Sequence, residues 1–240
     1  MKVTAIQFRR GERTHAEALS ELVELADEAG PGQDLIVLPE MAATGYIFAD
    51  ANAVAPWAEP ADGPTFAALS AVAKRHHTWI VAGFPEVDGR RLYNSALVIN
   101  RDGALAFVYR KTLLYTADET WALPGDSGYR SFDTGAGRFA VGICMDLNDD
   151  RFIRWLHADK PDVLAFPTNW VDEGTDVWTY WVSRLWGAGL TLVAANTWGH
   201  EGGTDFSGRS VILHELVAHA HAPKAGDGHL SAKVPLRSRH

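Results

Sequence analysis

Three apolar runs of the sequence end in side chains that could do chemistry together. The run "DLIVLPE" ends in Glu40, "ALAFVYRK" ends in Lys111, and "RFAVGICM" carries Cys144, the only cysteine of the chain. A thiol with its ordinary pKa of about 8.5 is mostly protonated at neutral pH, so a nucleophilic cysteine needs a base or a cation beside it. Glu40 could accept the thiol proton, and Lys111 could supply the positive charge.

The positions of these residues after predicted strands favour one shared site. Short continuous apolar runs are typical of strands that are covered on both faces. Ligands of open α/β sheets bind beyond the carboxyl ends of such strands, so the three side chains can meet in one crevice. Burial there would raise the pKa of Glu40 towards neutrality and make it a stronger base.

Each residue taken alone also has a purely structural interpretation. A lone cysteine in an apolar strand is most often a small core side chain, because free cysteine is among the most buried residue types. A glutamate after a strand usually begins a helix or lies in a solvated loop, and a lysine there is usually exposed. Only the combination of Glu40, Lys111 and Cys144 favours a catalytic site.

Three longer segments resemble a known family. "LPEMAATGY" at 38–46, "YRKTLLY" at 109–115 and "VGICMD" at 141–146 are similar, in this order, to the motif blocks of the nitrilase superfamily of carbon–nitrogen hydrolases. The flanking segments "YNSALVINRDG", "LPGD" and "GRSVIL" resemble family sequences as well. The resemblance covers most of the chain, from the first predicted strand to at least Leu213. It implies an α/β fold built as a four-layer α-β-β-α sandwich, and we expect one domain over 1–240.

The resemblance also implies a mechanism. Glu40 would be the general base, Lys111 would stabilise the tetrahedral intermediate, and Cys144 would form a thioester acyl-enzyme. The backbone N–H of Met145 would share the oxyanion with Lys111. The expected reaction is hydrolysis of a non-peptide carbon–nitrogen bond, foremost an amide with release of ammonia. Nitrile or carbamoyl hydrolysis, and an inactive family member that only binds a ligand, are the alternatives.

A second acid is expected near the lysine, because many family members carry another glutamate downstream of it. The segment "ADETWALPGD" offers Glu119 with Asp118 directly before it. We predict Glu119, although the spacing to the Pro-Gly turn, one residue shorter than the commoner pattern, keeps Asp118 as an alternative.

Candidate substrate contacts follow the next predicted strand. In this family the loop at that place lines the pocket, and here "FPTNW" places Asn169 and Trp170 there. A plain structural turn is the alternative interpretation of both residues. Tyr46 and Trp121 are likewise either substrate contacts or structural residues. Asn148 stands near the position where the commoner pattern has an arginine. The motif blocks are more similar to the branch that contains amidases of protein N-terminal asparagine and glutamine, which favours an amide over a nitrile.

The histidines do not form a recognisable metal motif. A zinc-binding His-Glu-x-x-His needs histidines four residues apart on one helix face, whereas His214 and His219 in "HELVAHAH" are five apart and would diverge. His219 and His221 could share a strand face, but two ligands make an incomplete site. His200 and Glu201 are expected in a surface loop. Since no phosphate-binding glycine motif is present either, we expect no metal and no cofactor.

The charge and composition of the chain limit the classes of partner that it is expected to bind. A net charge of −8 repels polyanions, and no basic run reverses it locally, so nucleic acid is not an expected partner. No apolar stretch approaches the ~18 residues of a membrane span, and no export signal is visible at the N-terminus. With a single cysteine, nothing ties the fold to an oxidising compartment, and we expect a cytoplasmic enzyme acting on a small amide or a short peptide.

Hydrophobic periodicity predicts the elements around the site. A strand at 3–8 is followed by a helix that ends near Gly30, and turn signals join three strands between 78 and 110 into an antiparallel meander. A last edge strand is expected in "HLSAKVP". A helix at 174–188 carries an apolar stripe of Trp178, Trp181, Val182 and Leu185. Since family members usually dimerise through helices near the active site, this stripe is the candidate surface of a homodimer.

Overall fold

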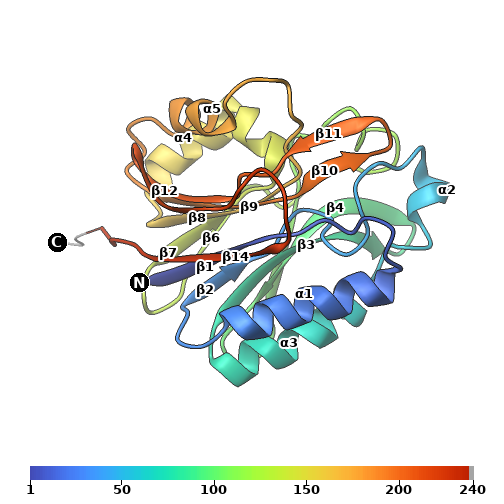
Figure 1. Ribbon diagram of the computed structural model, residues 1–240, viewed down its shortest axis with the longest axis horizontal. Coiled ribbons are helices and arrows are strands. Elements are labelled where there is room, and N and C mark those ends of the chain that lie inside the picture. Colours follow the sequence, from blue (N-terminus) through green and yellow to red (C-terminus); the bar gives the residue numbers. More distant parts are fainter. Residues whose placement is uncertain (238–240) are drawn as a thin grey trace.

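Two six-stranded sheets lie face to face in the computed structural model, and helices cover their outer faces (Figure 1). The structure describes residues 1–237, so the last three residues of the predicted domain lie outside that range. The first sheet contains, in spatial order, β14 (Gly228–Lys233), β1 (Lys2–Gln7), β2 (Leu35–Val37), β3 (Trp79–Asp88), β4 (Arg91–Ile99) and β5 (Leu105–Arg110). The second contains β13 (Val217–His221), β12 (Val211–His214), β9 (Thr191–Asn196), β8 (Val163–Thr168), β7 (Arg138–Val141) and β6 (Arg130–Asp133).

The helices form the two outer layers. On the first sheet lie α1 (His15–Ala29) and α3 (Pro64–His76), and on the second lie α4 (Asp150–Asp159) and α5 (Val177–Arg184) (Figure 1). Three short elements complete the chain: α2 (Ala51–Val54), the hairpin of β10 (Trp198–Glu201) and β11 (Thr204–Ser207), and the 3-10 helix η1 (Cys144–Asn148). The predicted four-layer α-β-β-α sandwich is confirmed.

Alternation along each inner strand explains why its sequence is apolar throughout. In β2, Leu35 and Val37 point between the sheets, whereas Ile36 packs towards the helices. The matching residues of the second sheet, such as Val163 and Ala165 of β8, fill the space between the sheets. Because both faces of these strands are covered, they lack the polar residue at every second position that marks a half-exposed strand.

Strand pairing agrees with the turn signals. β1, β2 and β3 are parallel, as are β7, β8 and β9, whereas β3, β4 and β5 form the predicted antiparallel meander. β14 pairs only with β1 and is the predicted edge strand. The carboxyl ends of β2 and β7 therefore lead into Glu40 and Cys144.

Two expectations about the C-terminal third were wrong. His214 and His219 were expected to diverge, but the hairpin of β12 and β13 brings their rings to a centroid distance of 6.3 Å. The expected surface loop at His200 and Glu201 is part of strand β10. The helix predicted at 174–188 is shorter, because Asp176 caps it by accepting a hydrogen bond from the N–H of Thr179.

Candidate active site

The turn that carries Glu40 is held against strand β3 by backbone hydrogen bonds. The N–H of Gly83 donates to Pro39 O at 3.1 Å, and the N–H of Ala42 donates to Gly83 O at 3.1 Å. A Cβ at Gly83 would lie 2.8 Å from the backbone nitrogen of Met41, so only glycine allows this approach. The first sheet thus fixes the backbone that positions the glutamate.

Lys111 follows β5 and reaches into the same buried space. Its Nζ lies 2.7 Å from Glu40 Oε1 and 2.6 Å from Asp118 Oδ2, and all three side chains are fully shielded from solvent. The hydroxyl of Tyr46 is 3.4 Å from the same Nζ and donates to Asp118 Oδ2 at 3.1 Å. The lysine is therefore held between two carboxylates.

The acid beside Lys111 is Asp118, and not Glu119, which the sequence analysis preferred. Asp118 is buried against Lys111, whereas Glu119 is exposed. Hydrogen bonds from the N–H groups of Asp118 and Glu119 to Tyr115 O, and from Ala122 N–H to Asp118 O, coil this segment into a turn. In such a turn neighbouring side chains point in different directions, so only one of the two acids can face the lysine.

Asn94 connects the two acids and was not singled out from the sequence. Its Nδ2 donates to Glu40 Oε1 at 2.7 Å and to Asp118 Oδ1 at 2.9 Å. The residue is fully buried in the middle of β4. The signal that could have identified it is a fully polar amide inside the apolar run "YNSALVI", where an unpaired amide would be costly.

Cys144 opens η1 with a backbone φ of 41°, which is unusual for a residue with a side chain. Asp146 anchors this turn, because its buried carboxylate receives hydrogen bonds from both sides of the site. The donors are the N–H groups of Ile143, Thr112 and Leu113, each at 2.9 Å, and the hydroxyls of Thr112 at 2.7 Å and Tyr109 at 2.8 Å. The nucleophile turn is thereby tied to the segment that follows Lys111.

The electrostatics of the cluster follow from burial and from its charges. Burial raises the pKa of Glu40 above its ordinary 4.5, and Lys111 opposes this shift. Burial lowers the pKa of Lys111, but the Asp118 and Glu40 carboxylates outweigh it and hold that pKa well above 10.5. Burial and the Glu40 carboxylate also raise the pKa of the Cys144 thiol. At rest, the Cys144 thiol is therefore neutral and Lys111 is cationic. Its raised pKa makes the Glu40 carboxylate a stronger base.

A cavity of about 210 Å³ opens at Cys144. The sequence candidates Met145, Asn169 and Trp170 all line it, and so does Tyr46. The backbone N–H of Asn169 donates to Glu40 Oε2 at 2.8 Å, so the loop after β8 also positions the glutamate. Residues from both sheets thus form one pocket around the thiol, whereas Trp121 packs beside Phe48 outside its lining.

The hairpin of β10 and β11 supports the pocket from behind. Glu201 accepts hydrogen bonds from the N–H groups of Tyr46 and Ile47 at 2.8 and 2.9 Å. This contact fixes the loop that carries Tyr46. Sequence reasoning missed it because the partners are 155 residues apart.

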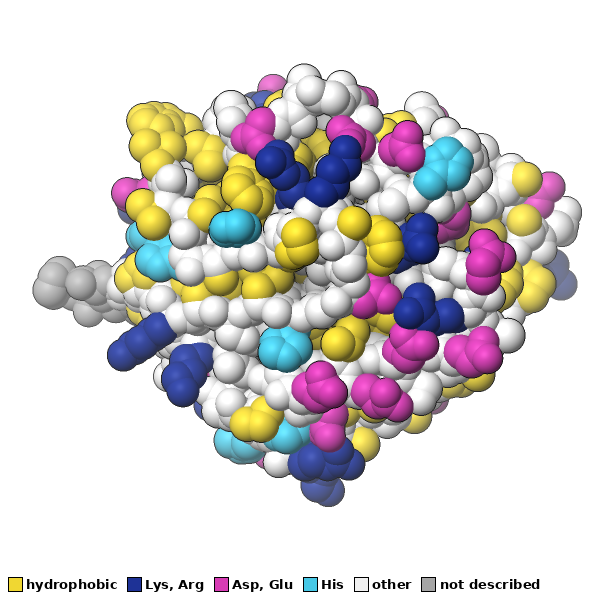
Figure 2. Space-filling view, in the orientation of Figure 1, with side chains coloured by type: hydrophobic (Ala, Val, Ile, Leu, Met, Phe, Trp, Pro, Cys, Tyr) yellow, Lys and Arg dark blue, Asp and Glu magenta, His cyan; other side chains and the backbone are white. Residues whose placement is uncertain are grey.

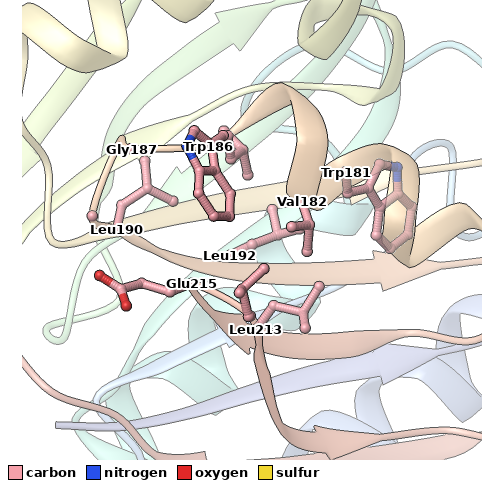
Figure 3. Close-up of a pocket in the computed structure, with 11 residues that line it drawn as sticks. Trp181, Val182, Trp186, Gly187, Leu190, Leu192, Leu213 and Glu215 are labelled. Carbon is pink, nitrogen blue, oxygen red and sulfur yellow. The ribbon is translucent and has the colours of Figure 1, made fainter.

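A second cavity of about 270 Å³ lies between α5 and the second sheet (Figure 3). Its lining is apolar, with Val182, Trp186, Leu192 and Leu213 among the residues, and Glu215 is its one charged side chain. Unlike the pocket at Cys144, this cavity has no cysteine, serine, lysine or histidine among the described residues that line it.

Two properties of residues 1–237 bear on other functions. None of the helices there is long and apolar enough to cross a bilayer. Within the same residues, no group of three or more histidine, cysteine or acidic side chains has the arrangement of a metal site.

Comparisons with known proteins agree with this geometry. A profile of the carbon–nitrogen hydrolase family matches residues 2–238. A probable nitrilase of Schizosaccharomyces pombe is 32% identical over 82% of this chain and 73% of its own, and a nitrilase of Pyrococcus abyssi is 35% identical over 80% and 73%. A protein N-terminal amidase of Saccharomyces cerevisiae is 32% identical over 50% of this chain and 31% of its own.

Solved structures share the fold over almost the whole chain. An amidase from Nesterenkonia superposes with a TM-score of 0.83 at 21% identity, covering 98% of this chain and 90% of its own. An N-terminal amidase bound to an Asn-Glu-Ala peptide superposes with a TM-score of 0.85 at 18% identity, covering 98% of this chain and 97% of its own. On the family match, the homologues and the fold, this chain belongs to the carbon–nitrogen hydrolase family of the nitrilase superfamily.

Proposed function

We propose that this carbon–nitrogen hydrolase is an amidase that releases ammonia from a small primary amide or from the amide side chain of a short peptide. The observation that carries the proposal is that Cys144 lines a pocket and interacts electrostatically with Glu40 and Lys111, which form a buried ion pair. In the proposed reaction, Cys144 is the nucleophile, Glu40 the base and Lys111 the cation.

Acylation begins when Glu40 accepts the thiol proton and the Cys144 sulfur attacks the amide carbon. The carbonyl oxygen becomes an oxyanion, stabilised by Lys111 Nζ and the backbone N–H of Met145. As the tetrahedral intermediate collapses, the carbon–nitrogen bond breaks. Glu40 returns its proton to the leaving nitrogen, which departs as ammonia and leaves a thioester.

Deacylation repeats these roles with water. Glu40 accepts a proton from a water molecule as the water oxygen attacks the thioester carbon. The second oxyanion uses the same donors, and its collapse breaks the carbon–sulfur bond. The acid product leaves, and the proton held by Glu40 returns to Cys144.

The amide is favoured over other carbon–nitrogen substrates by the amidases among the relatives and by the similarity of the motif blocks to N-terminal amidases. Nitrile hydrolysis is the second candidate, because two nitrilases are among the relatives. A free catalytic thiol also suits a reducing compartment such as the cytoplasm.

Intact-protein mass spectrometry tests the proposal. The protein is mixed with short amides, carbamoyl compounds, nitriles and peptides that begin with Asn or Gln, while ammonia is measured in parallel. We expect ammonia from an amide and an acyl adduct on Cys144, and neither from the folded Cys144→Ala variant. Ammonia from nitriles alone would select the second candidate. No product from any class, with Cys144 also inert to iodoacetamide, would indicate a binding protein.

The predicted stripe of α5 does not form an open surface, because Trp181 is buried and Trp178, Val182 and Leu185 pack against the same core. We propose instead that two copies of the chain assemble through exposed apolar residues beside α5. Trp186 and Leu216 line the cavity beside this helix and are 67% and 64% exposed. Figure 2 shows hydrophobic side chains gathered at the end of the molecule where α4 and α5 lie in Figure 1. Exposed apolar side chains in such a cluster are typical of an interface.

A further inference from the structure

The catalytic pocket has a buried floor and an exposed rim of different character. Cys144 and Asn169 are 8% and 3% exposed and lie at the floor, whereas Glu173, Thr175 and Tyr180 line the same cavity and are exposed. An acyl group bonded to the Cys144 sulfur must therefore extend towards the rim. Whatever group ends the acyl chain meets the side chains there.

The pocket wall, as far as residues 1–237 form it, offers acceptors and aromatic faces but no cation. Among these described residues, none that lines the pocket is a lysine, an arginine or a histidine. Asn169 is one of the residues that line the pocket, and its buried Oδ1 accepts no hydrogen bond within residues 1–237. A buried acceptor without a donor is costly, so this oxygen is suited to receive an N–H from a bound substrate.

The aromatic part of the wall faces the same space. The rings of Trp170 and Tyr180 lie with centroids 5.5 Å apart, and the Tyr180 hydroxyl donates to Asn148 Oδ1 at 2.6 Å. Aromatic faces attract cations as well as apolar groups. Asn148 is neutral and occupied by this contact, so it supplies no positive charge for an anionic substrate.

Glu173 is the acid of the rim loop that remains without a cationic partner. Its neighbours in the loop are neutralised, because Asp172 pairs with Lys224 at 2.6 Å and Asp176 pairs with Arg209 at 2.7 Å. Glu173 forms no ion pair within the described residues. Lys111 behind the floor adds no net positive field, since two carboxylates flank it.

We propose that Glu173, with the aromatic rim and Asn169, selects amides whose acyl chain carries an ammonium group at the end away from the amide. The inference rests on the proposed amidase function and adds the charge of the substrate. An ammonium there is attracted to Glu173 and to the aromatic faces, whereas a carboxylate meets like charge and no compensating cation.

The test compares three amides that differ at one end. γ-Aminobutyramide carries an ammonium, valeramide replaces it with a methyl group of similar size, and succinamate carries a carboxylate. We expect kcat/KM to be highest for γ-aminobutyramide and lowest for succinamate. The Glu173→Gln variant should reduce the preference for γ-aminobutyramide over valeramide by roughly fivefold, and salt should reduce it in the wild type.

A matched control and a binding measurement separate this inference from the proposed function. Glu119→Gln removes the same charge from an exposed position outside the pocket lining, so it should leave the preference unchanged. Calorimetric titration of the Cys144→Ala variant reports the order of affinities without turnover. Equal affinity for γ-aminobutyramide and valeramide, or the same preference in wild type and Glu173→Gln, would overturn the inference. Loss of turnover of all three amides with the affinity order intact would instead overturn the amidase function.

Discussion

Lys111 shows how single residues set the chemistry of this site. Two of its three N–H donors point to Glu40 and Asp118 at short distances, and Tyr46 Oη lies at the longer distance of 3.4 Å. An oxyanion could replace that long contact without disturbing the two short ones. The lysine is thereby oriented before substrate arrives, which is how preorganised donors stabilise a transition state.

The raised pKa of Glu40 predicts the acid limb of the pH profile. Protonated Glu40 cannot accept the thiol proton, so kcat/KM falls as the pH drops through that pKa. Because burial raises the pKa, the limb should lie above pH 4.5. Lys111 keeps its proton beyond pH 10.5 and sets no basic limb below it. A profile of valeramide hydrolysis checks this, and a limb at or below pH 4.5 would contradict it.

Replacing Asp118 should affect both catalysis and this limb. In Asp118→Asn, Lys111 loses one of its two charged partners and its fixed orientation, so we expect kcat to fall by about a hundredfold. The Asp118 charge also raises the pKa of Glu40, so the acid limb should move to lower pH. A merely structural role for Asp118 would not move the limb. Glu119→Gln, on the exposed neighbour, should change neither quantity.

Among the elements, the nucleophile turn depends on Asp146. Removing its carboxylate in Asp146→Ala leaves donors of two segments unpaired, namely that of Ile143 in one and those of Thr112 and Tyr109 in the other. Each unpaired buried donor costs about 1–3 kcal/mol, so we expect the free energy of unfolding to fall by more than about 3 kcal/mol. Urea denaturation measures it. Glu24→Ala, on the exposed face of α1, should change stability by less than about 0.5 kcal/mol.

The limits of sequence reasoning also lie at the scale of elements. The meeting of Glu40, Lys111 and Cys144 could be predicted, because continuous apolar runs indicate buried strands and the family resemblance joins the three strand ends in one site. That these strands belong to two facing sheets rather than to one could not be read from the apolar runs. The choice between Asp118 and Glu119 could not, since it depends on the direction in which one turn presents adjacent side chains. The support of Tyr46 by Glu201 was hidden as well, because nothing local indicates a contact between distant segments.

At the scale of the whole molecule, the site exists only because the two sheets face each other. Glu40 and Lys111 follow strands of the first sheet, whereas Cys144 and Asn169 follow strands of the second. The core between the sheets fixes the positions of these four residues relative to one another. Substitutions in that core should therefore affect activity as well as stability. Tyr180 of α5 reaches the same pocket from the outer layer.

The α5 face leads to the prediction about assembly. If two copies bury Trp186, then Trp186→Glu places a charge in an apolar contact and should convert a dimer into single chains. Sedimentation velocity at micromolar concentration measures the mass, and circular dichroism verifies folding. Leu123→Glu is the control, because Leu123 is 48% exposed but lies outside the α5 cavity. A wild-type mass near that of one chain would refute the dimer. Because Tyr180 lies on α5, directly before the turn that carries Trp186, we further expect the single-chain variant to bind substrate more weakly, with a raised KM.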